Sequence, residues 1–209
     1  MIHTDPVWLK AVTDISAVDL DNPRMMYQPT GELSGPEPQF KYALIADYGK
    51  QYNLKTFFET GTCYGNACEV ARQSFDEIYS IELSDEYYDY SRTRFKGVTN
   101  VHLYHGDSGY KLRQILLDTP SVPTLFWLDA HWSGGNTAKG ETDPPTELEI
   151  DVIHELRPDS VILIDDMWEM TSNWVARYGN GKSVSNKHGI TRIIPPQMDN
   201  LNREQIPPK

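Results

Sequence analysis

The chain has 209 residues, of which 39% are hydrophobic and 23% are charged. This length and composition fit one folded domain with its own core and exclude a disordered chain. The formal net charge of -11 opposes binding to a phosphate backbone, so no nucleic-acid substrate is expected. The sequence contains neither a visible signal peptide nor an apolar run of the ~18 residues that a membrane span needs, so no membrane association is expected.

The chain begins with a segment that lacks helical or strand periodicity. Residues 1–38 are rich in Pro, Asp and Gly and are expected to form an irregular N-terminal arm or cap. Apolar spacing then predicts a helix over residues 40–52. Cys63 and Cys68, the two cysteines of the chain, are expected to be reduced thiols of a cytoplasmic protein.

From residue 56 onward, short apolar runs alternate with helical patterns. Strands are predicted at 56–60, 77–83, 101–107, 124–130 and 160–166, and helices at 66–75, 85–96, 110–117 and 145–156. Ser84 is a predicted N-cap, and Thr146 with Glu149 has the spacing of a capping box. A further helix over 171–179 and a last strand at 190–194 complete the pattern.

This alternation predicts an α/β fold, a mostly parallel twisted sheet with helices on both faces. The domain is expected to span residues 39–195, with an irregular tail over 196–209. Ligands of such sheets bind outside the carboxyl ends of the strands. Each predicted strand carries a carboxylate there: Glu59, Glu82, Asp107, Asp129, and the pair Asp165 and Asp166.

The turn after the first predicted strand contains Gly61 and Gly65. Glycine permits a positive φ and lets a ligand approach the backbone closely. The spacing is not the dinucleotide fingerprint G-x-G-x-x-G. Glu59, two residues before the turn, suits a cation such as an ammonium or sulfonium better than a phosphate. Glu82, which ends the second strand, can accept hydrogen bonds from both hydroxyls of a ribose.

Three stretches resemble the motifs of one enzyme family. "ETGTCYG" (59–65) resembles the first motif of class I S-adenosylmethionine (SAM)-dependent methyltransferases, with Cys63 in place of the usual middle glycine. "YSIELS" (79–84) resembles the second motif, and "HGDS" (105–108) resembles the acidic third motif. The resemblance covers about residues 55–167 and implies a Rossmann-like fold with SAM as the cofactor.

By this resemblance, the turn at 59–65 would hold the methionine part of SAM. Glu82 would hold the ribose, and Asp107 with Ser108 would lie beside the adenine. The full set of expected cofactor-binding residues is Glu59, Thr60, Gly61, Thr62, Gly65, Glu82, Leu83, Gly106, Asp107, Ser108 and Asp129.

The last two predicted parallel strands bring three more carboxylates together. Asp129 follows one strand, and Asp165 and Asp166 follow the next, ~4.8 Å away if the strands are neighbours. Three close carboxylates repel one another unless a cation lies between them, and oxygen ligands of this kind suit Mg²⁺. The layout resembles the metal-dependent small-molecule O-methyltransferases of the catechol and macrocin types. That resemblance implies Mg²⁺ or another divalent metal at these three residues.

Catalysis is expected from Asp129 and from His131, two residues further on. His131 could be a general base, since its reference pKa of ~6.5 suits proton transfer near neutral pH. It could equally be a metal ligand or a structural partner of an aspartate. The glycine-rich loop over 133–143 follows directly and is a candidate lid.

The function expected from these features is SAM-dependent O-methylation of a small hydroxylated molecule, such as a sugar or natural product. A second hypothesis is a nicotinamide (NAD)-dependent oxidoreductase on a Rossmann-like fold, which would transfer hydride and would not respond to S-adenosylhomocysteine (SAH). A third is a non-catalytic binding protein with this fold. The short region after Asp166 needs a cover, which the N-terminal arm or a second copy of the chain in a homodimer could supply.

Overall fold

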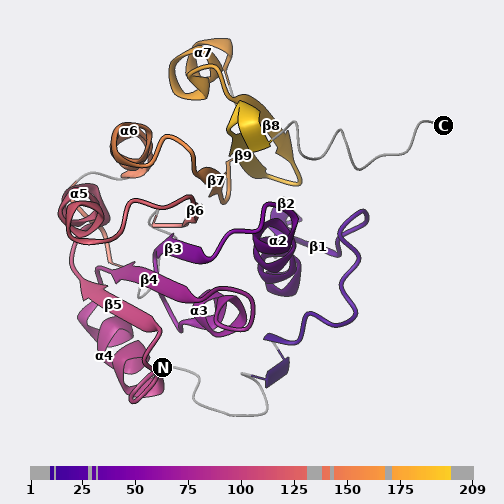
Figure 1. Cartoon of the computed structure of the whole chain (residues 1–209). Coiled ribbons are helices and arrows are strands. Elements are labelled where there is room, and N and C mark those ends of the chain that lie inside the picture. The colour runs from indigo at the N-terminus through magenta and orange to yellow at the C-terminus, as the bar shows by residue number, and fades with distance from the viewer. Residues whose placement is uncertain are drawn as a thin grey trace.

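The computed structural model describes residues 10–11, 13–27, 30–31, 33–130, 138–141, 144–167 and 171–198 (Figure 1). The strands are β1 (Met25–Tyr27), β2 (Leu33–Pro36), β3 (Thr56–Thr60), β4 (Glu77–Glu82), β5 (Val101–His105), β6 (Thr124–Leu128), β7 (Val161–Ile164), β8 (Ser183–Lys187) and β9 (Ile190–Ile194). The helices are α2 (Pro38–Gln51), α3 (Asn66–Ala71), α4 (Asp85–Arg94), α5 (Ser108–Asp118), α6 (Thr146–Leu156) and α7 (Ser172–Gly179).

The main sheet has seven strands in the order β5-β4-β3-β6-β7-β9-β8. The strands from β5 to β7 in this order are parallel to one another. Strand β9 is antiparallel to β7, and β8 pairs with β9 as an antiparallel hairpin. The predicted α/β fold with a mostly parallel sheet is confirmed. Strand β8 was not predicted, because its sequence is polar and its residues are mostly exposed.

Helices cover both faces of this sheet (Figure 1). On one face, α2 and α3 bury apolar side chains such as Phe40, Leu44 and Cys68 against the strands. On the other face, α5, α6 and α7 bury side chains such as Leu112 and Ile150. The middle strands are therefore buried on both sides, which explains why their sequences are continuous apolar runs. None of the described helices is both long enough and apolar enough to cross a membrane.

Parallel pairing brings the carboxyl ends of the strands into register. Thr60 pairs with Ile81 on β4 and with Leu128 on β6, and Leu128 pairs with Ile164 on β7. The four residues that directly follow these paired strand residues therefore lie in one row across the sheet. That row contains Glu82, Gly61, Asp129 and Asp165 in spatial order. The backbone extends the pairing into it, since Asp129 N donates to Thr60 O and Asp165 N donates to Leu128 O, each at 3.0 Å.

Two local features differ from the sequence-based expectations. The N-terminal segment expected to be irregular contains the short antiparallel pair β1–β2. The capping box at Thr146 is wrong, because Pro145 is the N-cap residue of α6 and no side chain caps this end. Thr146 is then already the first helical residue, and Glu149 is buried instead of reaching back to the helix start.

Candidate active site

The turn after β3 is built around a close approach between two strand ends. Gly61 has φ +91, and a Cβ placed on it would lie 2.5 Å from the Asp129 carbonyl oxygen. The backbone N–H groups of Gly61 and Thr62 donate to Ile81 O on β4 at 2.9 and 3.3 Å. Gly61 is therefore required both for its dihedral angle and because a side chain would push β6 away. This packing fixes where Asp129 stands relative to the turn.

Two further positions of the turn, Cys63 and Gly65, also have a left-handed backbone. Gly65 has φ 72, and a Cβ there would lie 2.6 Å from the Phe95 ring. Cys63, which stands where the family motif has its middle glycine, has φ 48. The left-handed conformation that glycine usually supplies is therefore kept here by a cysteine. Cys63 is half-buried and Cys68 is buried, and both are free thiols.

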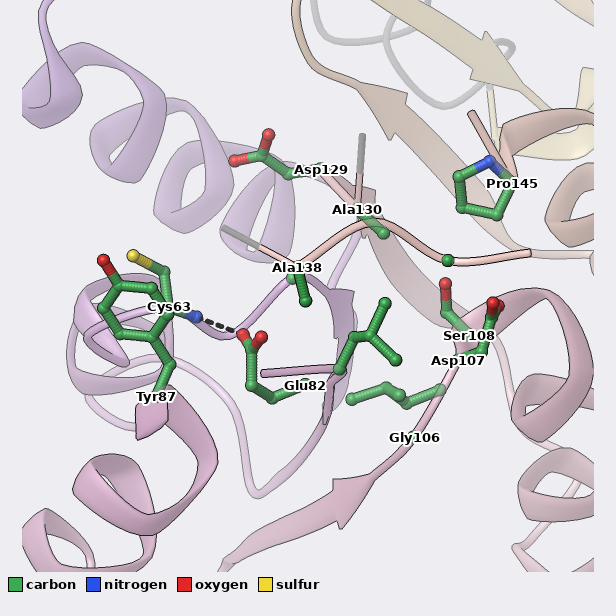
Figure 2. A pocket seen from close by; sticks show the side chains of 14 residues that line it. Cys63, Glu82, Tyr87, Gly106, Asp107, Ser108, Asp129, Ala130, Ala138 and Pro145 are labelled. Carbon is green, nitrogen blue, oxygen red and sulfur yellow. Dashed lines mark hydrogen bonds between the residues drawn. The ribbon is translucent and has the colours of Figure 1, made fainter. Parts of the chain in front are cut away.

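Glu82 at the end of β4 is held by backbone N–H groups on both sides. Its Oε2 accepts from Cys63 N at 2.7 Å (Figure 2), and its Oε1 accepts from Ser84 N at 2.8 Å. Burial raises the pKa of Glu82, and these backbone donors act in the opposite direction. Each carboxylate oxygen has a second lone pair, so both oxygens can still accept a ligand hydroxyl. The predicted ribose acceptor is thus fixed in position before any ligand binds.

Asp107 links the start of α5 to the segment 138–141. It is the N-cap of α5, with Oδ1 accepting from Gly109 N at 2.9 Å, and Oδ2 accepts from Glu141 N at 3.1 Å. Ser108 beside it is buried. The described part of the predicted lid, 138–141, therefore lies against the expected adenine side of the site.

A cavity of about 270 Å³ opens between these elements (Figure 2). Figure 2 shows Cys63 and Tyr87 on one side, Glu82 on the floor, and Asp107 with Ser108 at the other side. Seven of the predicted cofactor residues line it: Gly61, Glu82, Leu83, Gly106, Asp107, Ser108 and Asp129. The other lining residues were not predicted to bind the cofactor: Cys63, Ile81, Tyr87, Ala130, Ala138, Gly140 and Pro145.

A second cavity of about 150 Å³ lies next to the first and shares Gly61, Cys63 and Asp129 with it. Glu59 and Thr62 line this second cavity, together with Lys41 and Tyr42 from α2. Thr60 and Gly65, also predicted to bind the cofactor, are buried and line neither cavity. The two cavities together follow the row of strand ends from β5 to β6.

Glu59 lies beneath the turn and is almost completely buried. Its Oε1 accepts from Cys68 Sγ and from Ser80 Oγ, each at 2.8 Å. Burial raises the pKa of Glu59 to about 7, against the effect of these two donors. Glu59 therefore ties β3 to α3 and β4, and it borders the second cavity near the expected position of the methionine part.

Glu149 of α6 is a second buried carboxyl group. Neither of its oxygens has a partner in hydrogen-bond geometry among the described residues, although the Ser108 and Thr60 hydroxyls lie close enough to favour its charged form. Burial outweighs them and raises the pKa of Glu149 to about 7. The sequence placed Glu149 at a helix start, and only the tertiary packing reveals its burial.

The end of the site at Asp129 and Asp165, where the methyl acceptor is expected and which we call the acceptor end, contains a lysine that the sequence did not single out. Lys41 Nζ lies 2.5 Å from Asp165 Oδ2 and 3.7 Å from Asp166 Oδ1. Burial alone would lower the pKa of Lys41, but the charges of Asp165, Asp129 and Asp166 outweigh it and raise that pKa. Burial raises the pKa of Asp165, and the Lys41 ammonium acts in the opposite direction. A cation does lie among the three predicted carboxylates, and it belongs to the protein.

This contact bears directly on the predicted metal site. Among the described residues, no three Asp, Glu, His or Cys side chains are grouped so that they could hold a metal ion. Asp165 has one oxygen on Lys41 and accepts from Asp166 N with the other, at 2.9 Å. In this arrangement, the donor set of Asp129, Asp165 and Asp166 does not fit a divalent ion, because the lysine holds the place that such an ion would need.

His131, the predicted base, lies outside the described residues, and so does most of the predicted lid loop, at 131–137 and 142–143. Its three candidate roles therefore stay predictions. Asp129 is described: its backbone is fixed by β3, and its side chain borders both cavities.

Comparison with known proteins identifies the fold. No protein-family model matches the sequence, and a search of curated proteins finds no significant match. Solved structures do match: the SAH-bound Podospora anserina methyltransferase PaMTH1 has a TM-score of 0.57 at 14% identity, covering 93% of this chain and 97% of that one. The O-methyltransferase from Bacillus cereus in complex with SAH has a TM-score of 0.56 at 14% identity, covering 93% of both chains.

The O-methyltransferase TomG from Streptomyces achromogenes, involved in tomaymycin synthesis and solved in complex with SAM, has a TM-score of 0.56 at 15% identity. The match covers 93% of this chain and 92% of TomG. These likenesses extend over nearly the whole chain. The chain therefore has the Rossmann-like fold of class I methyltransferases, as its three motifs predicted.

Proposed function

We propose that this chain is a SAM-dependent methyltransferase that transfers the methyl group to a hydroxyl oxygen of a small molecule. The observation that carries the proposal is Glu82, a carboxylate whose oxygens are fixed by Cys63 N and Ser84 N on the floor of the larger cavity. Neutral ribose hydroxyls can donate to such a carboxylate, whereas a phosphate in the same place would be repelled.

The rest of the larger cavity supports the same ligand. Asp107 and Ser108 border it 25 and 26 positions after Glu82, where the third motif of the family places the adenine. The smaller cavity continues from the turn at Gly61 toward Asp129. A ligand bound along both cavities would extend its methionine part toward Asp129. The fold neighbours TomG and the Bacillus cereus enzyme are O-methyltransferases solved with SAM and SAH, which supports an oxygen as the methyl acceptor.

The proposed reaction is an in-line displacement at the methyl carbon. The acceptor oxygen forms a bond to this carbon while the bond between carbon and sulfonium sulfur breaks, and SAH leaves. The hydroxyl proton passes to a base, for which His131 remains the predicted residue. No covalent enzyme intermediate is needed, so the protein contributes orientation, exclusion of water and proton removal. Whether a divalent metal is required, as the sequence led us to expect, is tested in the same assay with EDTA and with Mg²⁺.

The proposal is tested first by calorimetric titration with SAH and then by methyl transfer from labelled SAM. The acceptor panel should contain sugars, catechols and other small hydroxylated compounds. We expect wild-type protein to bind SAH and Glu82→Ala to lose about 100-fold in affinity, since two hydrogen bonds to a charged group are removed.

Glu86→Ala is the matched control, because Glu86 is an exposed carboxylate four residues further along the chain. It should bind SAH like the wild type. Binding of NAD in place of SAH would favour the oxidoreductase hypothesis. SAH binding without turnover on any acceptor class would favour a non-catalytic protein and would count against the proposed function.

A further inference from the structure

Lys41 is held rigidly at the acceptor end by the helix that carries it. It lies in the first turns of α2, directly after Phe40, which is completely buried in the core. Leu44 and Ile45, one turn further on, are buried in the same core. The side chain of Lys41 is only 19% exposed. Because these neighbouring core residues anchor α2 against the sheet, the backbone of Lys41 is held beside the strand ends, within reach of Asp165.

The contacts of Lys41 occupy the carboxylates that a metal ion would use. Nζ lies 2.5 Å from Oδ2 of Asp165, whose side chain is only 1% exposed. The other Asp165 oxygen accepts from Asp166 N at 2.9 Å. A divalent ion at this place would have to displace the ammonium from Asp165, and it would be repelled by that ammonium if both stayed. The site therefore already contains its balancing cation.

Lys41 also lines the smaller cavity, in which the proposed function places the methionine part of SAM and, beside it, the acceptor. It borders the smaller cavity together with Tyr42 and Asp129, and this cavity joins the larger one at Gly61 and Cys63. An ammonium group has three N–H donors. One of them is directed to Asp165 within hydrogen-bond distance, and Asp166 is further away at 3.7 Å. A donor therefore remains for an oxygen of a molecule in the smaller cavity.

We propose that the Lys41 ammonium takes the place of the divalent metal at the acceptor end, so that Lys41 binds the acceptor oxygen directly and methyl transfer needs no metal ion. The part of this proposal that concerns the acceptor rests on the proposed function. The part that concerns metal binding does not. It also limits the acceptor: a single hydroxyl can be held by one ammonium, and a vicinal pair is not required as it would be for chelation.

The first experiment is a calorimetric titration with Mg²⁺ and with Mn²⁺, carried out on the protein alone and on the protein with added SAH. We expect no binding by wild type at millimolar metal. Lys41→Met removes the charge while keeping the length of the side chain, and it leaves the carboxylates without their cation. This variant should gain measurable metal binding. Lys50→Met is the matched control, because Lys50 is an exposed lysine of the same helix; its variant should behave like the wild type.

The second experiment measures methyl transfer with the best acceptor of the panel. Wild-type activity should be the same in EDTA and in Mg²⁺. Lys41→Met should lose more than about 100-fold in kcat/KM, since a donor to the reacting oxygen is removed, while its SAH affinity stays within a few-fold of wild type. Added Mg²⁺ should restore part of this loss. Lys41→Arg, which keeps the charge, should lose less.

Two results would overturn the proposal. One is wild-type protein that binds Mg²⁺ more tightly than Lys41→Met does. The other is wild-type activity that EDTA abolishes and Mg²⁺ restores. The metal titration needs no acceptor, so it decides the role of Lys41 even if no methyl transfer is found. If Lys41→Met does not fold, the titration of wild-type protein still decides, because metal binding by the wild type alone contradicts the proposal.

Discussion

The two ends of the cavity system hold their carboxylates in different ways. At the adenosine end, Glu82 and Asp107 accept hydrogen bonds from backbone N–H groups of their own turns and of nearby loops. At the acceptor end, Asp165 is held by Lys41, which is 124 positions away in the sequence. The first arrangement follows from local strand–turn–helix geometry. The second depends on the docking of one helix onto the sheet, and it should therefore respond differently to substitution.

The largest effect is expected where the two ends meet, at Gly61. Gly61→Ala would place a Cβ 2.5 Å from the Asp129 carbonyl oxygen, with φ +91. We expect roughly 2–5 kcal/mol of lost stability and loss of SAH binding, because β6 must move and the backbone is strained. The measurement is urea unfolding together with SAH titration.

Gly97→Ala separates strain from steric contact. Gly97 has φ +83, and a Cβ there would meet nothing within 4 Å. Its variant should lose only about 1–2 kcal/mol, from backbone strain, and should bind SAH normally. Equal losses for the two variants would mean that the close approach between β3 and β6 is not what Gly61 provides.

The next effect concerns the acceptor end and is a coupling between two residues. Lys41→Met leaves Asp165 buried without its ammonium, and Asp165→Asn leaves the ammonium without its nearest carboxylate. Each single variant should cost about 2–4 kcal/mol, and the double variant should cost about 1–3 kcal/mol less than the sum. Urea unfolding of the four proteins gives this coupling energy. Additive losses would show that the pair does not hold α2 on the sheet.

A smaller effect, of opposite sign, is expected from Glu149→Gln. The pKa of this buried carboxyl group is about 7 in the folded protein and 4.5 when exposed. Well below pH 4.5 the group is neutral in both states, so it causes no loss of stability. As the pH rises to 7, the unfolded chain ionises first and the folded state is progressively disfavoured. The glutamine variant should therefore be more stable by roughly 1–3 kcal/mol at about pH 8 and nearly unchanged at acidic pH.

Thermal unfolding across this pH range tests the prediction. Glu59 also has a pKa of about 7. Its effect on stability is present in both the wild type and the variant, so the difference in stability between the two proteins reports on Glu149 alone. Glu86→Gln, at an exposed position, should show no such pH-dependent gain. A gain from Glu149→Gln that is independent of pH would point to packing and not to ionisation.

The sequence predicted most of the adenosine end because its determinants are local. Apolar runs followed by an acid defined the strands and their ends, and parallel pairing then placed Glu82, Asp129 and Asp165 in one row. Ser84 and the glycine turn were readable for the same reason, since capping and positive φ depend on a few consecutive residues. The caps and the glycine turn each lie within one strand–turn–helix unit, and the row of strand ends follows from the regular parallel pairing of such units.

What the sequence did not predict depends on packing between distant segments. Lys41 lies in a helix whose apolar spacing was recognised, but nothing local connects it to a strand end 124 positions later. Glu149 had the spacing of a cap residue, yet the helix begins at Thr146 and turns Glu149 toward the sheet. Three carboxylates indicated a cation correctly, but composition alone could not distinguish a metal ion from the ammonium of a lysine.

The smallest effect is expected from Ser84→Ala, and it tests how local the adenosine end is. Ser84 Oγ accepts from Tyr87 N at 3.5 Å and caps α4, while Ser84 N donates to Glu82 Oε1 at 2.8 Å. Alanine removes the long side-chain contact and keeps the backbone donor. We expect about 0.5–1 kcal/mol of lost stability by urea unfolding and an SAH affinity within a few-fold of wild type. A large loss of SAH affinity would mean that the hydroxyl itself orients Glu82, and that the backbone donors alone do not hold the ribose acceptor in place.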